Sequence, residues 1–598
     1  MLNLLVKYAQ DNDLAAEPGF RPKDVRWAIT CDDGGRFLNV NELGDTNQKR
    51  NSGRTFRMCP NLSQPEIKRG GKGCRHFLVD NAEVVALYGD NADDPKVLEK
   101  HAYFVDLLRQ ASAALPELGV IAAMLDDPHA LDQIRQALTE GRARPTENVT
   151  FVVMDRDPMF LVEDDRWHGW WRAFRKILAR KTDAKKKSSK SKPAADRLTP
   201  CLASGELIRP TLTHPKVSGL SDVSGLSMGD ALVSFKQDSF RSYGLTQSEN
   251  AAVSEEMAAA YRAALNHLVK HHGRRLAGAK VVHWYTGEKE VRPEDDPFAM
   301  LDNPLAFMDE EEEREDAERE AQHRAKQLLE SIRTGKRADL LDYRYYALTL
   351  SGASGRVMVR DWMEGRFEDL VSNIDAWFEN LAIVRRDGMA LAAPPKLMAV
   401  LGGTVRDLKD LPPPFVGKMW RVAVRREPIP QHAVAQALTR AKIDVVQDQP
   451  ANHARMGLMK AYHLRKGDRF MEPYLNENHP DPAYHCGRLM AVLADLQYAA
   501  LGDVGAGIVQ RYYPAASSTP ALVLGRLTRT SQFHLNKLEG GLARWYEDRI
   551  ADIWARIKDD HLPTTLRLDQ QSLFAMGYYQ QKAAPKGKKN NAKEDSND

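Results

Sequence analysis

The sequence is poor in cysteine and lacks long hydrophobic runs. Its 598 residues include five cysteines, which lie far apart and form no C-x-x-C pair. Neither a disulfide framework nor a cysteine-based zinc knuckle fits this pattern. No stretch approaches the about 18 consecutive apolar residues that span a membrane, and the start of the chain shows no secretory leader. We therefore expect a cytoplasmic protein with no membrane partner.

An excess of charge of one sign is also missing. The formal net charge is +3, so bulk charge does not by itself indicate a nucleic-acid partner. The charges are nevertheless segregated, because residues 166–192 are strongly basic and residues 309–320 are strongly acidic. We expect two local fields of opposite sign that cancel only in the total.

Familiar catalytic motifs do not occur. The pattern G-x-x-x-x-G-K-[ST] is absent, so NTP hydrolysis finds no support. His267 and His271 are spaced as H-x-x-x-H, but Leu268 stands where a zinc peptidase carries its glutamate, and no third ligand is indicated. The sequence predicts no catalytic residue, no metal site and no cofactor. One alternative stays open, a two-metal nuclease whose scattered carboxylates meet only in the folded chain.

Strand-like and helical segments alternate in the first part of the chain, and helices alone follow. We predict an α+β fold with mixed α/β N-terminal and middle regions and a C-terminal antiparallel helical bundle. After Trp171 the Lys-, Ser- and Ala-rich composition up to Pro193 predicts a flexible, exposed loop. The predicted domains are 1–192, 193–429 and 430–582, with a disordered tail at 583–598.

Hydrophobic periodicity places several individual elements. It predicts a strand at 149–154, a helix that begins after an N-cap at Ser254, and a β-hairpin at 343–363. The acidic segment is predicted to be an exposed helix or loop. The predicted helices of the bundle are 431–446, 484–502, 516–539, 542–558 and 568–581.

The segment CLASGELIRPTLTHPKVSGL, residues 201–220, brings a cysteine and a histidine close together in sequence. A nucleophilic Cys201 needs a base within about 3 Å and a lowered pKa, and the sequence proximity of His214 supplies neither. We interpret the segment as framework, with a buried cysteine and a histidine that hydrogen-bonds a turn. Its turn presents Lys216 as a candidate contact to a nucleic-acid backbone.

A basic, glycine-rich stretch lies upstream, at residues 49–76. Three glycines within KRGGKGCRH, residues 68–76, let the backbone approach a ligand closely, and the surrounding cations suit phosphates. Such a loop can reach into a minor groove, although a solvated loop has the same composition. The candidate contacts to a nucleic-acid backbone here are Lys49, Arg50, Arg54, Lys68, Arg69 and Arg75.

The predicted bundle carries a second basic face. At about 100° per residue, Arg526, Arg529 and Lys537 fall near one side of a helix, and leucines fall on another. Cations spaced along a rigid helix can follow a phosphate backbone, although a solvated face is the simpler alternative. Beside Arg511, Tyr512 and Tyr513 offer the stacking surfaces that single strands use. The candidate contacts to a single strand are Arg511, Arg526, Arg529 and Lys537.

Several blocks of the chain, in the same order, resemble the large subunit of the type I-C CRISPR surveillance complex, often called Cascade. The likeness covers most of the chain. Besides residues 201–220, the blocks are FLVDNAEVVALYG (77–89), DALVSFKQDSFRSYG (230–244), NAAVSEEMAAAYRAALNHL (250–268), YYALTLS (345–351), RYYPAASSTPALVLGRL (511–527) and LFAMGYYQQ (573–581).

The resemblance implies a DNA-binding subunit without catalytic activity. Related subunits sit at the 5′-handle end of a CRISPR RNA and contact the handle-binding, backbone and small subunits. They recognise the protospacer-adjacent motif in duplex DNA, promote R-loop formation, hold the displaced strand and recruit a separate helicase-nuclease. No motif-reading residue of the family is carried over to this chain. From local chemistry we expect recognition of the flanking motif by Gly70, Gly71, Lys72, Gly73 and Asn81.

The resemblance also implies that the bundle, which is similar to the small subunit, can be made separately from an internal start. Met456, Met459, Met471 and Met490 are candidates for that start. Two other functions remain as alternatives. One is a metal-dependent nuclease that acts on RNA or guide precursor, and the other is a general single-strand-binding adaptor.

Overall fold

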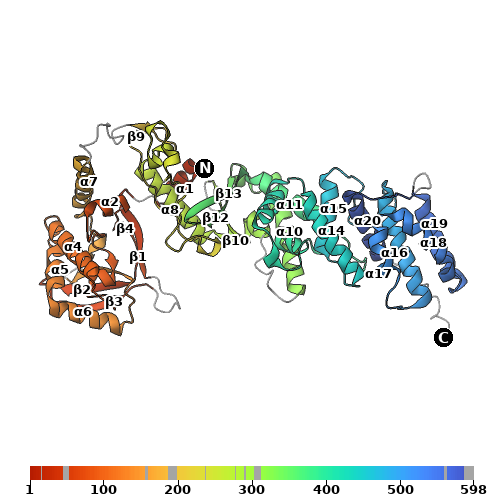
Figure 1. Cartoon of the computed structure of the whole chain (residues 1–598), viewed down its shortest axis with the longest axis horizontal. Coiled ribbons are helices and arrows are strands. Elements are labelled where there is room, and N and C mark those ends of the chain that lie inside the picture. Colours follow the sequence, from red (N-terminus) through yellow and green to blue (C-terminus); the bar gives the residue numbers. More distant parts are fainter. Residues whose placement is uncertain are drawn as a thin grey trace. The chain divides into compact units, whose positions relative to one another are not determined.

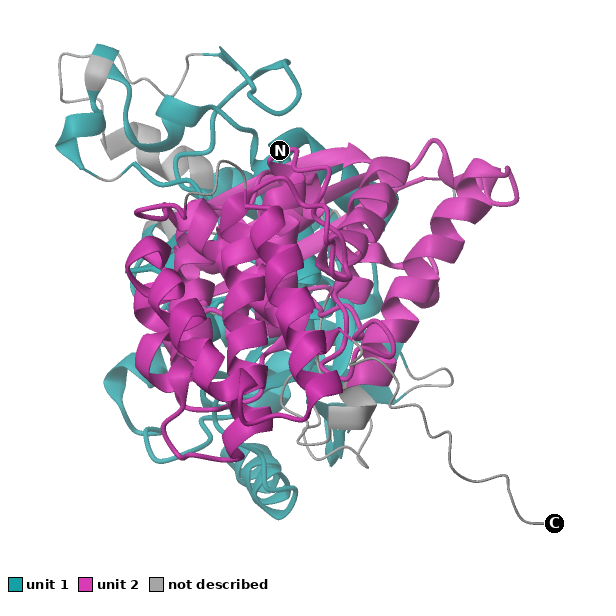
Figure 2. Cartoon of the chain, turned by 90° about the vertical axis from the view of Figure 1, so that its right-hand side faces the viewer, with its two compact units in different colours: residues 1–271, 352–358 teal, residues 272–351, 359–598 magenta. Residues whose placement is uncertain are grey.

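The computed structural model describes residues 1–14, 17–44, 53–62, 64–154, 159–185, 198–235, 237–276, 278–287, 291–301, 311–557 and 562–584. These residues form the predicted α+β fold, with sheets in the first two thirds and helices after them (Figure 1). Two compact units are distinct (Figure 2): unit 1 comprises residues 1–271 and 352–358, and unit 2 comprises 272–351 and 359–598. The domain boundaries predicted at 192/193 and 429/430 lie inside these units and stay predictions.

Unit 1 is built on a mixed sheet with the strand order β3-β2-β6-β5, and β7 pairs with β6. The strand predicted at 149–154 is confirmed as β6, which pairs in parallel with β2, and its central residues are all buried. A separate antiparallel ribbon joins β1 to β4. The strands are β1 (Phe20–Val25), β2 (Trp27–Asp32), β3 (Phe37–Glu42), β4 (Arg54–Pro60), β5 (Asp80–Asn81), β6 (Asn148–Met154) and β7 (Met159–Phe160), together with the short pair β8 (Thr199–Pro200) and β9 (Leu207–Ile208).

Eight α-helices accompany these strands among the described residues of unit 1. The predicted N-cap at Ser254 is confirmed, since its hydroxyl accepts a hydrogen bond from the Met257 backbone N–H at 3.2 Å. The helices are α1 (Leu2–Asp11), α2 (Gln64–Gly70), α3 (Ala82–Val85), α4 (Pro95–Ala111), α5 (Glu117–Asp126), α6 (Pro128–Glu140), α7 (His168–Lys185) and α8 (Glu255–His271).

The flexible loop predicted to begin after Trp171 is wrong for its first part. Helix α7 continues to Lys185 instead of ending near Trp171. The reason is packing: Trp171, Phe174 and Leu178 recur at helical spacing, and Trp171 and Leu178 are buried in the core of unit 1. Composition alone pointed to a loop because basic residues are frequent here, and among the described side chains Arg172 and Lys176 are exposed. Residues 186–197 lie outside the described part of the chain.

Unit 2 begins with the strand order β10-β11-β12-β13. The predicted hairpin is confirmed as β12 (Arg344–Ala353) and β13 (Arg356–Arg366), joined at Ser354 and Gly355, which both have positive φ. The other strands are β10 (Arg274–Leu276) and β11 (Ala279–Thr286). The acidic segment enters the 23-residue helix α10 (Glu311–Arg333), whose Ala321, Ala325 and Leu328 are buried.

The described residues after β13 form helices without a further strand, in agreement with the predicted helical bundle. The single helix predicted at 516–539 is wrong, because residues 517–519 separate the helix Ile508–Ala516 from the helix Pro520–Leu535. Helix α16 packs on α20 at a close crossing, because a Cβ on Gly487 would lie 1.9 Å from the Phe574 carbonyl oxygen and a Cβ on Gly577 would lie 2.0 Å from that of Tyr484. The helices are α11 (Phe367–Leu381), α12 (Leu397–Gly402), α13 (Pro413–Arg425), α14 (Gln431–Val446), α15 (His453–Arg465), α16 (Pro482–Leu501), α17 (Ile508–Ala516), α18 (Pro520–Leu535), α19 (Gly540–Ala555) and α20 (Leu568–Ala583).

Candidate nucleic-acid interface

The glycine-rich loop follows the end of α2 and packs against α4. A Cβ on Gly73, which has φ +75°, would lie 2.5 Å from the Glu99 carbonyl oxygen. A Cβ on Gly70 would likewise lie 2.1 Å from Cys74 Sγ. Gly71 differs, because it has φ +89° and nothing within 4 Å of its Cβ direction. Packing therefore accounts for Gly70 and Gly73, while Gly71 leaves open space beside Lys72.

The predicted phosphate contacts of this region fall into three groups. Lys68 and Lys72 are exposed, and neither makes an ion pair with a described residue. Arg54 already has partners within the protein. Its guanidinium lies 2.6 Å from Glu163 and over the rings of Phe56 and Phe160. Lys49, Arg50 and the side chain of Arg69 lie outside the described residues.

Asn81 serves the fold directly. It is the N-cap of α3, and its Oδ1 accepts a hydrogen bond from the Val84 backbone N–H at 3.1 Å. The residue is half-buried, and its backbone belongs to β5. Motif recognition by Asn81 stays a prediction. Because the cap uses Oδ1, the group left for such a contact is the Nδ2 amide.

The buried cysteine predicted in residues 201–220 is confirmed, but the prediction that His214 hydrogen-bonds a turn is wrong, because its partner lies on a helix. Cys201 and His214 are both buried, and His214 Nδ1 lies 2.7 Å from the hydroxyl of Tyr261 on α8. Burial lowers the pKa of His214 to about 4, so this imidazole is neutral. Lys216 projects from the surface beside the bridge between Val217 and Asp230. It remains available as a phosphate contact.

A basic cluster that the sequence did not single out lies in the same unit. Its members are linked in pairs: the charges of Lys23, Arg21 and Arg75 act on His76, and Arg21 also acts on Arg262 of α8. These residues come from three distant segments, so no local sequence pattern reveals the cluster. Of its members, sequence reasoning named only Arg75.

The basic face predicted in the bundle is present on α18. Leu524, Leu527 and Leu535 are buried on one side, whereas Arg526 and Arg529 are exposed on another. Two exposed apolar residues complete that outward face, because Leu522 and Phe533 are 76% and 71% exposed and stand at helical spacing from the arginines. Lys537 is exposed just beyond the helix, and Arg511 is exposed on α17. None of these four cations makes an ion pair with a described residue.

The expected stacking surface on Tyr513 is wrong. Tyr513 is 1% exposed and meets Phe574 and Tyr578 edge-on inside the bundle. It points inward because α17 packs on α14, α16 and α18. Tyr512 is half-buried against the same core. The exposed aromatic ring near the arginines is that of Phe533, which sequence reasoning missed although its spacing from Arg526 and Arg529 indicates the same helical face.

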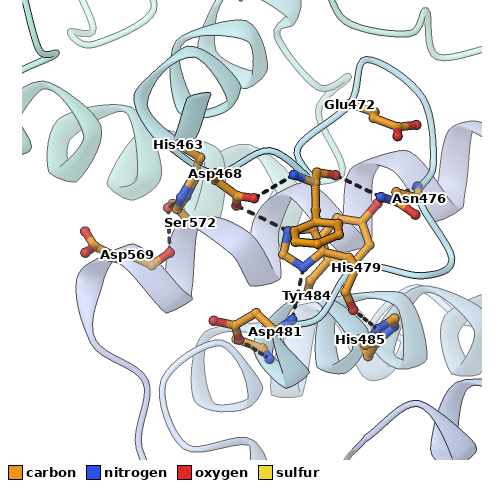
Figure 3. Close-up of polar contacts among 12 residues, drawn as sticks. His463, Asp468, Glu472, Asn476, His479, Asp481, Tyr484, His485, Asp569 and Ser572 are labelled. Atoms are coloured by element: carbon orange, nitrogen blue, oxygen red, sulfur yellow. Dashed lines mark hydrogen bonds and ion pairs between the residues drawn. The ribbon is translucent and has the colours of Figure 1, made fainter. Parts of the chain in front are cut away.

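A polar network holds the loop between α15 and α16 (Figure 3). His479 lies 3.3 Å from Asp468 through Nε2, accepts a hydrogen bond from the Asp481 N–H and stacks on Tyr484. His485 donates from Nε2 to the His479 carbonyl oxygen at 2.6 Å. His479 and His485 are buried and Asp468 and Asp481 are half-buried, so the network holds this loop in place.

Within the described ranges, no group of three or more His, Cys, Asp and Glu side chains is arranged to hold a metal ion. The H-x-x-x-H pair lies at the end of α8, where His267 Nδ1 is 3.1 Å from the Tyr8 hydroxyl. The helices of the described chain include none that is long and apolar enough to span a bilayer.

Comparison with known families accounts for nearly all of the chain. The family model of the CRISPR-associated protein Cas_Csd1 matches residues 5–585. The chain belongs to the Cas_Csd1 family. It is thus a CRISPR-associated protein, a subunit of a surveillance complex whose partners include CRISPR RNA and the other subunits. The match confirms the resemblance found in the sequence. No curated protein matches the chain.

Proposed function

We propose that this Cas_Csd1 protein is the non-catalytic, DNA-binding large subunit of a cytoplasmic type I-C complex. It recognises the protospacer-adjacent motif in duplex DNA, promotes R-loop formation, holds the displaced strand and recruits a separate helicase-nuclease. The observation that carries the proposal is the set of exposed cations without ion pairs among the described residues, in the glycine loop and on α18. Unpaired cations are the groups that phosphates neutralise with release of counterions.

The glycine loop is the proposed reader of the flanking motif. Lys72 stands next to Gly71, where the backbone turns with positive φ and nothing lies within 4 Å of the Cβ direction. The ammonium group of a lysine can donate hydrogen bonds to acceptors on base edges. Gly70 and Gly73 contribute by fixing the turn against Cys74 and α4, and Asn81 by its amide.

Helix α18 is the proposed support of the displaced strand. Arg526 and Arg529 supply charge without reading bases, and the exposed ring of Phe533 offers the stacking surface that Tyr513 does not. Arg511 and Lys537 extend the charge beyond the helix. Contacts with the handle-binding, backbone and small subunits complete the proposed assembly.

The motif-reading role is tested with the reconstituted, guide-loaded complex. Binding is measured to duplexes that carry the correct or a wrong flanking motif, with wild-type chain, Lys72→Ala and Asn81→Ala. We expect Lys72→Ala to reduce discrimination by about tenfold, because one base contact contributes about 1–3 kcal/mol. Lys68→Ala, which removes a neighbouring exposed cation, weakens binding to both duplexes alike. Unchanged discrimination in Lys72→Ala removes that residue from the reading role.

The nuclease alternative receives no support from the family match or from the described side chains. It is tested directly by incubating the chain with guide precursor and Mg²⁺ or Mn²⁺. Cleavage that EDTA abolishes would replace the proposal with the nuclease. The general adaptor differs in another way, because it would bind single strands without the guide complex and without any preference for a flanking motif.

A further inference from the structure

The short hairpin of β8 and β9 in unit 1 exposes leucines on one of its two sides. Pro200 lies directly opposite Leu207 in the antiparallel register, so their side chains share one side of the hairpin. Leu198 and Leu202 stand two residues before and after Pro200, which places them on the same side by the alternation of a strand. Leu202 and Leu207 are each 66% exposed, and Leu198 is 56% exposed. These four residues form an apolar surface, which we call the leucine face.

The opposite side of the hairpin is anchored in the fold. Cys201, which alternates with Pro200 and Leu202, is 3% exposed. Its backbone N–H donates to the Glu206 carbonyl oxygen at 2.8 Å and so extends the pairing of the two strands. The Leu202 N–H donates to the Ala252 carbonyl oxygen at 2.8 Å, ahead of α8. The leucine face is therefore preformed for a contact.

The charge of the hairpin makes a nucleic-acid strand an unsuitable ligand for this face. Between Leu198 and Ile208 the one charged residue is Glu206, an acid. A nucleic-acid strand binds mainly through cations that neutralise its phosphates, and this stretch has none. The leucine face fits instead the centre of a protein–protein interface, where charged residues are depleted and apolar side chains are enriched.

The size of the leucine face distinguishes between protein partners. Four such residues expose an area on the order of a few hundred Å², whereas each partner in a stable interface contributes about 800 Å². The face is thus too small to hold two copies of this chain together by itself, and it fits as one part of a larger interface. The other subunits of the surveillance complex can supply that larger interface, because the chain belongs to the Cas_Csd1 family.

We propose that the leucine face docks on an apolar surface of another protein subunit of the surveillance complex. Burial of these side chains removes apolar area from water, which favours association without any requirement for charge. Because the hairpin is anchored before the partner arrives, little conformational freedom is lost on docking. The inference deepens the proposed function, since it assigns a surface by which the chain joins its complex, and it rests on the assembly proposed there.

The test measures how tightly the chain joins a guide-loaded complex that is assembled without it. The wild type is compared with Leu202→Gln combined with Leu207→Gln. Leu98→Gln is the matched control, because Leu98 is a 43% exposed leucine on α4. We expect the double variant to bind the complex about 30-fold more weakly, since two leucines lose most of the apolar burial that they gain on docking. The control should change the affinity less than twofold, and wild-type affinity of the double variant overturns the docking face.

A salt series and nucleic-acid binding test the chemistry of the partner. The ratio of wild-type to double-variant affinity should stay constant from about 150 to 500 mM salt, because apolar contacts release no counterions. The double variant should also bind free CRISPR RNA and duplex DNA as the wild type does. A ratio that falls to one at high salt, or a loss confined to nucleic acid, assigns the face to charge-dependent binding and overturns the proposal.

Two further measurements ask whether the face is free in the chain and covered in the complex. The Tm of the free double variant should equal or exceed that of the wild type, because both leucines are exposed. A lowered Tm shows that another segment of the chain packs on the face and overturns the proposal. In the assembled complex, a photo-crosslinking side chain in place of Leu207 should join the chain to a second protein subunit. Crosslinks confined to the chain itself or to nucleic acid overturn it as well.

The outcomes separate this inference from the proposed function. If the double variant joins the complex as the wild type does, and the complex without the chain has no preference for the correct flanking motif, the docking face is overturned and the proposed function stands. If the double variant joins weakly, but the complex without the chain keeps the full preference, the docking face stands as an assembly surface and the proposed function fails.

Discussion

The cations of unit 1 and those of α18 in unit 2 are held in different ways. On α18, Arg526 and Arg529 stand on the open side of a helix whose other side is buried, so water solvates them fully. In unit 1, Arg75 and Arg262 are half-buried, with Nε atoms that lack a partner among the described residues. An open face can follow any strand by charge alone, whereas these buried Nε atoms lie out of reach of a ligand.

Acid is expected to produce the largest effect, because it adds charge to neutral histidines buried in the bundle. Burial lowers the pKa of His463 and of His485 to about 4. Around His463, Asp468 and Asp569 oppose this shift, while His479 and Lys466 reinforce it. Below pH 6.5 these histidines bind protons in the unfolded chain but stay neutral in the folded chain. The stability of the fold therefore falls as the pH drops from 6.5 toward 4.

Each of these two histidines can account for about 3 kcal/mol of that loss. Thermal unfolding of the bundle at pH 7 and pH 5 checks the sign. In His463→Asn the pH dependence is smaller than in the wild type, whereas replacement of the exposed His129 by Asn leaves it unchanged. A Tm that rises between pH 7 and pH 5 contradicts the account.

Two glycine substitutions sharpen the contrast between a loop fixed by packing and an open helix face. Gly73→Ala places a Cβ 2.5 Å from the Glu99 carbonyl oxygen at φ +75°, and we expect a loss of about 2 kcal/mol. Gly525→Ala adds a methyl group on α18 where nothing lies within 4 Å, and we expect a gain of about 0.5–1 kcal/mol. Equal effects of the two substitutions on thermal stability would contradict the difference between the packed loop at Gly73 and the open helix face at Gly525.

Loss of charge from the open face is expected to act more weakly and without sequence preference. Arg526→Gln combined with Arg529→Gln should lower affinity for single-stranded DNA about tenfold near 150 mM salt and reduce the salt slope by about 1.4. The measurement is binding of labelled strands of different sequence across a salt series. An unaltered slope in the double variant contradicts the assignment of α18.

The smallest effect is expected at Arg54, although the sequence placed it with the other phosphate contacts. Its guanidinium is 2.6 Å from Glu163, an exposed pair of the kind that contributes about 1 kcal/mol or less. Arg54→Gln should therefore change duplex affinity less than twofold in a titration with the guide-loaded complex. A several-fold loss would show that Arg54 leaves Glu163 when the strand binds.

Local patterns made much of the fold predictable. The buried run of β6, the Ser254 cap of α8, the hairpin of β12 and β13, and α14 all depend on residues that are near one another in sequence. Helix α15 escaped prediction because Ala454–His463 are buried on all sides, which removes the polar face that marks an amphipathic helix.

The candidate site was predictable only in its local parts. The charge of the glycine loop and the face of α18 follow from spacing, and both are exposed as expected. The pairing of Arg54 with Glu163 depends on a tertiary contact between distant segments. Sequence periodicity carries no information on such contacts. Tyr513 was misplaced because no helix was predicted at α17, so the buried side of this helix could not be assigned.

The most direct test of the central claim compares target binding by guide-loaded complexes assembled with and without this chain. The measurement is the affinity for duplexes that carry the correct or a wrong flanking motif, at one salt concentration near 150 mM. The account predicts that the complex without the chain loses its preference for the correct motif and most of its affinity. Equal affinity and equal preference in the two complexes would contradict it.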